Sequence, residues 1–112
     1  MAYDEALAER IRLVLADAPD LVERKMFGGI CFMVGGHMAC GVLGDELIAR
    51  IGPEAADRAL EAPDVREFDF TGRPMRNIVM VAGAAVGADA DLERWVAEAR
   101  AFAAALPPKR LR

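Results

Sequence analysis

The chain lacks the residues that most hydrolytic and redox enzymes depend on. Serine is absent, and the 112 residues include one histidine and two cysteines. A serine nucleophile is therefore excluded, and His37 has no evident carboxylate to orient it beside a thiol. The glycines also lack phosphate-loop spacing, because neither G-x-G-x-x-G nor G-K-[ST] occurs. These absences favour a non-enzymatic protein with no cofactor and no catalytic residues.

Two further features are missing, a surplus of basic residues and a long apolar run. The formal net charge is −4, which argues against bulk attraction to nucleic acid or to an anionic membrane, so any such binding would have to be local. No apolar run approaches the roughly 20 residues that span a bilayer, and the first residues do not form a signal peptide. We therefore expect a cytoplasmic protein with reduced cysteines. Its length and its 54% hydrophobic content predict one folded domain over residues 1–112.

Apolar periodicity predicts helices at both ends of the chain. Asp4 is placed to cap the first helix, which Pro19 stops, and its apolar stripe contains Leu7, Ile11, Val14 and Leu15. Asp89 or Asp91 is placed to cap the last helix. Its stripe is Leu92, Trp95, Val96, Ala99, Phe102, Ala103 and Leu106, and Pro107 and Pro108 end it. We expect Trp95 and Phe102 to pack on the sheet, with a loss of about 3 to 5 kcal/mol for a fully buried Phe102→Ala.

The middle of the chain is predicted to form strands around a short helix. Residues 21–27 are either a connector or an edge strand, and residues 30–51 form two linked hairpins with turns at Gly35–Gly36 and Gly44–Asp45. Gly52 and Pro53 begin a short helix that ends before Pro63, and strands follow over 66–70 and 75–81. The resulting order, α-β-β-β-α-β-β-α, predicts an α+β fold with an antiparallel sheet.

The hairpin register bears on the two cysteines and the histidine. With Gly35 and Gly36 as the turn, Val34 faces His37 and Cys31 faces Cys40 directly, which places the histidine on the other side of the sheet. The three side chains then do not converge, so no metal site is expected. The opposed cysteines are close enough for a disulfide, but buried thiols are favoured in the cytoplasm.

The same register divides the hairpins into two faces. The predicted core face contains Cys31, Met33, Met38, Cys40, Val42, Leu47, Ala49 and Ile51. The other face is unusually apolar for a solvated surface, and it includes Phe32, Val34, Leu43 and Ile48. A helix of the same chain could cover this face. We expect instead that a second copy covers it and forms a homodimer.

The stretch FDFTGRPMR raises the possibility of an anion site. Arg73 and Arg76 follow a Thr-Gly turn, and with Lys25 and Arg50 they are the candidate ligands for a phosphate or carboxylate. Alternation along a strand separates Arg73 from Arg76 unless Arg73 belongs to the turn. Solvated arginines are the favoured interpretation.

Several motifs together resemble the amino-terminal domain of the TfoX/Sxy family. They are MFGG at 26–29, GVLGDEL at 41–47, RIGPE at 50–54, FDFTGRPM at 68–75, the helix with Trp95, and LPPK at 106–109. The resemblance covers nearly the whole chain. It implies a small α+β domain with a curved antiparallel sheet, similar to type III secretion chaperones. The family is named for regulators of natural competence and offers no established catalytic residues.

Three functions follow as hypotheses. The first is a stand-alone regulatory or adaptor protein that acts through an unidentified protein partner. The second is a nucleic-acid or anion binder using Lys25, Arg50, Arg73 and Arg76. The third is a small thiol enzyme using Cys31, Cys40 or His37.

Overall fold

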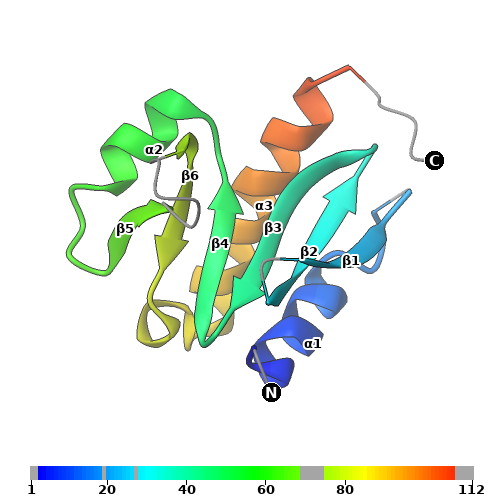
Figure 1. Cartoon of the computed structure of the whole chain (residues 1–112), viewed down its shortest axis with the longest axis horizontal. Coiled ribbons are helices and arrows are strands. Elements are labelled where there is room, and N and C mark those ends of the chain that lie inside the picture. The colour runs from blue at the N-terminus through cyan, green and yellow to red at the C-terminus, as the bar shows by residue number, and fades with distance from the viewer. Residues whose placement is uncertain (1–2, 19, 27, 69–74, 108–112) are drawn as a thin grey trace.

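The computed structural model describes residues 3–18, 20–26, 28–68 and 75–107 (Figure 1). Its elements in chain order are α1 (Glu5–Val14), β1 (Val22–Met26), β2 (Gly29–Val34), β3 (His37–Leu43), β4 (Glu46–Arg50), α2 (Pro53–Ala59), β5 (Val65–Phe68), β6 (Met75–Val81), the 3₁₀ helix η1 (Gly83–Val86) and α3 (Asp89–Ala105). The predicted α+β class is confirmed. Within these ranges no helix is both long enough and apolar enough to cross a membrane.

One six-stranded antiparallel sheet organises the chain. The strand order is β1-β2-β3-β4-β6-β5, so β1 and β5 form the two edges. Residues 21–27 were predicted as a connector or an edge strand, and β1 settles this in favour of the strand. The Gly35–Gly36 turn is confirmed, with positive φ angles of 61° and 84° that suit glycine in a two-residue hairpin.

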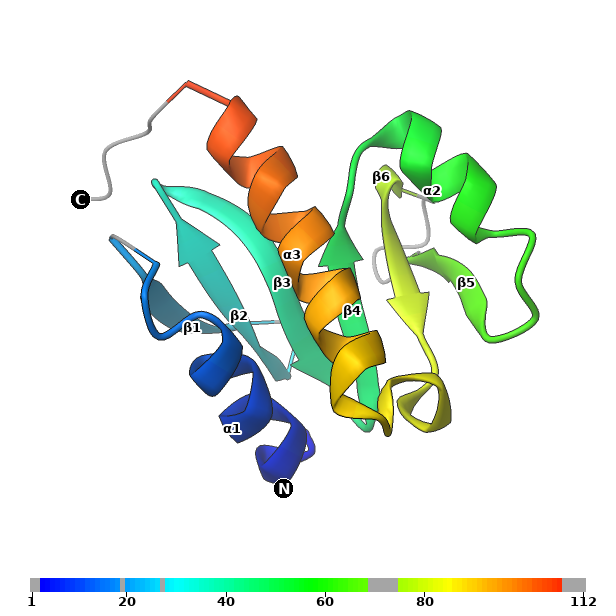
Figure 2. The ribbon, with the colours of Figure 1, turned by 180° about the vertical axis from the view of Figure 1, so that it is seen from behind.

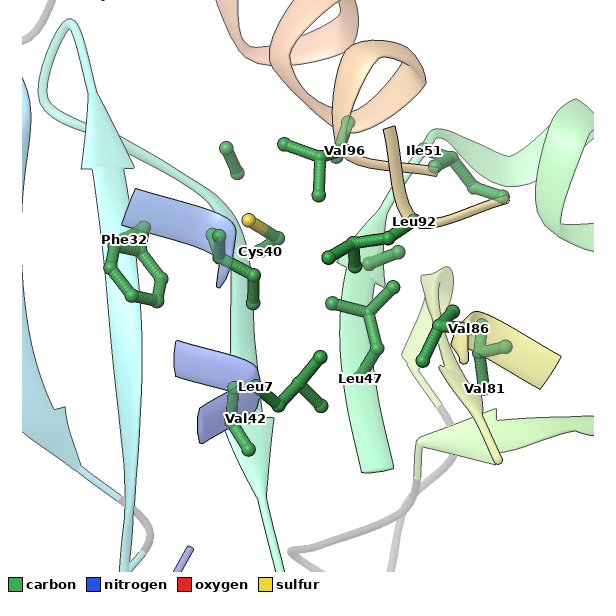
Figure 3. Close-up of a cluster of buried hydrophobic side chains, with 14 of the residues drawn as sticks. Leu7, Phe32, Cys40, Val42, Leu47, Ile51, Val81, Val86, Leu92 and Val96 are labelled. Carbon is green, nitrogen blue, oxygen red and sulfur yellow. The ribbon is translucent and has the colours of Figure 1, made fainter. Parts of the chain in front are cut away.

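The helices pack on one face of the sheet, which we call the inner face. Seen from behind, α1 and α3 lie in front of the strands (Figure 2). α2 packs against β6 and contributes Ala56 to the same core. Leu7 of α1 and Leu92 and Val96 of α3 surround Cys40 and Leu47 of the sheet (Figure 3). This group and its buried neighbours form the main core.

A β-bulge in β3 overturns part of the predicted register. Val34 faces His37 and Met33 faces Met38 as expected, but the pairing then shifts so that Phe32 faces Cys40 and Cys31 faces Gly41. Ala39 is left without a partner. A single extra residue in one strand changes which side chains share a face, and nothing in the apolar pattern of this hairpin revealed it.

The bulge therefore corrects the predicted faces. Phe32 and Val34 point inward and belong to the main core, together with Cys40. Leu43 and Ile48 lie on the opposite, outer face. The four residues predicted to form one interface are thus divided between two faces.

A second, smaller cluster occupies the outer face. Ile48 packs with Phe68 of β5 and with Ile78 and Met80 of β6, and Ile48 is only 1% exposed. Met38 and Leu43 are partly buried against it. We call the four buried residues the outer cluster. Because Ile48 is already covered within its own chain, the expectation that it lies on an open surface is wrong.

The ends of the helices agree only in part with the prediction. Asp4 caps α1 as expected, since its side chain accepts hydrogen bonds from the amides of Ala6 and Leu7. Ala88 is the N-cap of α3, which begins at Asp89 without a side-chain cap bond. The acidic residues instead lie in the first turn, where negative charge also favours the helix dipole.

Phe102 departs from its predicted place in the core. Trp95 packs against the main core as expected. Phe102 is half-buried and lies beside Gly52, where a Cβ atom would come within 2.8 Å of its ring. Gly52 has a φ of 92°, so glycine suits that position both for its backbone and for the close approach of the ring.

Candidate functional site

The four basic residues predicted to bind an anion do not form one group. Lys25 lies in edge strand β1, whereas Arg50 ends β4, and β2 and β3 stand between them. Lys25 pairs with Ile30, whose side chain belongs to the main core. The side chain of Lys25 therefore leaves the backbone on the inner face of the sheet. Arg73 lies outside the described residues. Lys25 is therefore remote from the other candidates.

Arg50 and Arg76 lie on neighbouring strands. Arg50 pairs with Ile78, two residues after Arg76, so alternation places the bases of both arginines on the outer face. The guanidinium carbon of Arg50 lies 5.6 Å from the centre of the Phe102 ring, a cation–π distance that directs this side chain toward α3. Arg76 lines an open depression with Pro53 and Asn77. Anion binding by these arginines stays a prediction.

The two cysteines are buried free thiols on opposite faces of the sheet. Cys40 belongs to the main core, and Cys31 faces Gly41 on the outer side. Burial raises the pKa of Cys31 to about 11. Burial, with a smaller effect of Cys31, raises the pKa of Cys40 to about 12. Both thiols are therefore protonated near neutral pH, which is unfavourable for a nucleophile or a metal ligand.

His37 takes part in a different contact. It begins β3 beside the hairpin turn, and its Nε2 atom makes a hydrogen-bond contact with the carbonyl oxygen of Pro107 after α3. Cys40 lies three residues further along the strand, inside the core. The part of the chain that the structure describes holds no group of three or more histidine, cysteine or acidic side chains arranged for a metal ion.

A groove between α1 and α3 is the most distinctive feature of the surface. It has a volume of about 260 Å³ and is lined by Arg10, Leu13 and Val14 of α1 and by Asp89, Leu92 and Glu93 of α3. Leu13 is 70% exposed, and among the described residues only Val22, at 36%, is another exposed large apolar side chain. The groove thus joins an exposed leucine to the partly and fully buried apolar residues beside it.

Two ion pairs hold the helices on either side of this groove. Arg10 contacts Asp89 at 3.0 Å and also donates to the carbonyl oxygen of Gly87 at 3.1 Å. Arg100 contacts Asp17, just after α1, at 3.0 Å. Exposed pairs of this kind contribute little stability, typically below about 1 kcal/mol each. Both helices also bury apolar side chains in the main core, so the pairs add to a contact that packing already makes. Leu13 lies between Arg10 and Asp17 in sequence.

The net negative charge of the chain lies in α3 and in the segment around α1, where Asp4 and Asp17 flank a helix that is itself neutral. Residues 4–17 contain four acidic and two basic side chains, and residues 89–105 contain the same numbers, which gives each segment a formal charge of −2. The remaining ten acidic and ten basic residues cancel, so the net charge of −4 belongs to these two segments. Glu93 lines the groove itself.

Leu13 was missed by the sequence analysis. The predicted stripe of the first helix contained Leu7, Ile11, Val14 and Leu15, and these side chains are buried or half-buried in the structure. Leu13 is an apolar residue off that stripe. Its exposure is indicated by its position on the polar side of an amphipathic helix, although single exposed leucines are common.

One protein-family model matches most of the chain. A family model for the TfoX N-terminal domain matches residues 14–103. The match spans all six strands, α2 and nearly all of α3, and it begins one residue after Leu13. No curated protein and no solved structure matches the chain.

Proposed function

The chain belongs to the TfoX N-terminal domain family, and from that premise we propose that it is a non-enzymatic regulatory or adaptor protein that works through contacts with other proteins. The observation that carries this proposal is the α1–α3 groove with its exposed Leu13. A regulatory role in competence or transcription is suggested by the family resemblance alone.

The exposure of Leu13 supports a protein contact because of its surroundings. An isolated surface leucine needs no explanation. Leu13, however, borders a groove beside Val14 and Leu92, so a partner side chain entering there would contact several apolar groups at once. Clefts with a small apolar centre and a polar rim are typical places for such anchors.

The state of the cysteines supports a protein without thiol chemistry. A reactive thiol is normally partly exposed and has a lowered pKa. Cys31 and Cys40 are instead buried, and burial raises the pKa of each well above neutrality. The thiol-enzyme hypothesis therefore loses its proposed nucleophiles.

The homodimer stays a prediction, and its original basis has changed. Phe32, Val34 and Ile48 are buried within the chain itself, so they are not available to a second copy. If a second copy is a partner, Leu13 is the better contact. Light scattering after size exclusion over a tenfold concentration range measures this directly.

The proposal is tested by comparing wild-type protein with Leu13→Gln and Ala104→Gln. Leu13→Gln removes the apolar contact while keeping a helix-forming residue, and Ala104→Gln adds the same exposed amide to α3 away from the groove. Each tagged protein is crosslinked in a native lysate, and the captured proteins are quantified. We expect a defined set whose capture falls about fivefold or more with Leu13→Gln, the size of effect that loss of an apolar anchor produces.

Ala104→Gln should retain that set. An identical set for all three proteins, or no enriched protein at all, would contradict the proposal.

A further inference from the structure

The α1–α3 groove has features that indicate the kind of partner it takes, if the proposed function is correct. Its two walls are helices that run in the same direction (Figure 2). Pairs near the start and toward the end of α3, Asp89 with Arg10 and Arg100 with Asp17, tie those walls together. The groove is thus a pre-formed trough between two helices rather than a gap in a mobile loop.

The shape of the groove fits another helix. A helix packs on a pair of helices by placing its ridge of side chains into the trough between them, at interaxial distances of about 8 to 10 Å. The volume of about 260 Å³ holds only one or two side chains, not a whole ligand. One bulky apolar residue in contact with Leu13 and Leu92, with a neighbour one turn away, matches the usual spacing of helix-in-groove recognition.

The charge of the groove indicates which polar side chains the partner helix carries. Of its charged lining residues, Arg10 and Asp89 pair with each other, which leaves the carboxylate of Glu93 as the uncompensated charge. The surrounding segments 4–17 and 89–105 hold the entire net charge of −4. An acidic partner would be repelled at this surface, whereas lysine or arginine beside the apolar anchor would be attracted.

We propose that the α1–α3 groove binds a basic amphipathic helix of a partner protein, with one bulky apolar side chain seated against Leu13 and Leu92 and a lysine or arginine beside Glu93. This deepens the proposed function and depends on it. The apolar contact provides most of the binding affinity, and the acidic surface provides specificity for a basic partner.

The test uses three synthetic helical peptides labelled with a fluorophore. The first has leucines at helical spacing and lysines elsewhere, the second replaces its lysines with glutamates, and the third replaces its leucines with alanines. Binding to the full chain is measured by fluorescence anisotropy at two salt concentrations. We expect binding of the leucine–lysine peptide only.

Two matched variants separate the groove from general charge attraction. Glu93→Gln and Glu98→Gln each remove one exposed carboxylate from α3, but only Glu93 lines the groove. Glu93→Gln should weaken binding of the leucine–lysine peptide by about two- to fivefold, the range of an exposed ion pair, and Glu98→Gln should leave it unchanged. Leu13→Gln should weaken it by about tenfold, as expected for loss of a leucine contact.

Three outcomes overturn the inference. Equal weakening by Glu93→Gln and Glu98→Gln would show that bulk charge attracts the peptide. Equally tight, Leu13-dependent binding of the leucine–glutamate peptide would show that the groove accepts helices regardless of charge, which leaves the proposed function intact. No binding of any peptide would also overturn it, and Leu13-dependent capture from lysate would then decide the proposed function separately.

Discussion

The outer cluster and the α1–α3 groove both contain large apolar side chains, but only in the outer cluster are all of them buried. Ile48 in the outer cluster is 1% exposed, whereas Leu13 beside the groove is 70% exposed. The sequence alone predicts an open face around Ile48, and it gives no prediction for Leu13. The apolar character of a segment therefore does not show whether it faces water.

What separates the two regions is the number of elements that converge on them. The outer cluster receives side chains from β4, β5 and β6, and each of its four members is at most 4% exposed. The described residues that line the groove come from α1 and α3, and Val14 and Leu92 are less exposed than Leu13. Substitutions in the two regions should accordingly affect different properties, stability in the first and binding in the second.

The largest expected effect is that of Ile48→Glu. A carboxylate placed among Phe68, Ile78 and Met80 is buried without a partner, which costs about 3 to 5 kcal/mol. Denaturant unfolding measures the loss, and the loss should shrink on acidification because protonation removes the buried charge. Ile48→Val, as a control, should cost only about 0.5 to 1.5 kcal/mol. An unchanged midpoint for Ile48→Glu would mean that the outer cluster is open to water.

Phe102→Ala should have an intermediate effect. A fully buried phenylalanine would cost about 3 to 5 kcal/mol, but Phe102 is half-buried beside Gly52 and Arg50, so about 1.5 to 2.5 kcal/mol is expected. Phe32→Ala, which truncates a fully buried ring in the main core, is the matched comparison and should cost the full amount. Equal losses for the two variants would place Phe102 in the core after all.

A smaller effect is expected from the ionisation of Cys40 at high pH. Its pKa is raised from 9.0 to about 12 in the folded chain, so the unfolded chain loses its proton first and stability falls as pH rises above about 9. Between pH 8 and pH 10 the contribution is about 1 kcal/mol. Urea unfolding across this range should show a steeper decline for wild type than for Cys40→Ala. Parallel pH curves would contradict the burial of this thiol.

The smallest change in stability is expected for Leu13→Gln. Its side chain is 70% exposed, so the free energy of unfolding should change by less than about 0.5 kcal/mol. Thermal or urea unfolding checks this, and the same variant should lose partner capture. A loss above 1.5 kcal/mol would mean that Leu13 belongs to the packing between α1 and α3, and the contrast with Ile48 would disappear.

Local signals predicted most of the fold. The Asp4 cap, the Gly35–Gly36 turn, the Gly52–Pro53 helix start and the strand at 75–81 each depend on residues close in sequence, and each is present. The bulge at Ala39 depends instead on how β2 and β3 pair, which a period-two pattern does not encode. One skipped residue was enough to move Phe32 and Val34 into the main core.

The candidate site was less predictable than the fold. The basic residues were chosen for their chemistry, yet their proximity depends on strand order, which separates Lys25 from Arg50. The groove depends on how α1 and α3 lie together, and their contact between Arg10 and Asp89 joins residues 79 positions apart in the chain. No local pattern indicates a pair at that separation.

The bulge at Ala39 also bears on whether Cys31 and Cys40 can form a disulfide. In a regular hairpin Cys31 and Cys40 would stand directly opposite each other, close enough for an oxidant to join them. Because β3 skips Ala39, the two sulfur atoms are on different sides of the backbone, one beside Gly41 and the other in the main core. The bulge therefore works against a disulfide within the hairpin, and both cysteines are free thiols in this fold.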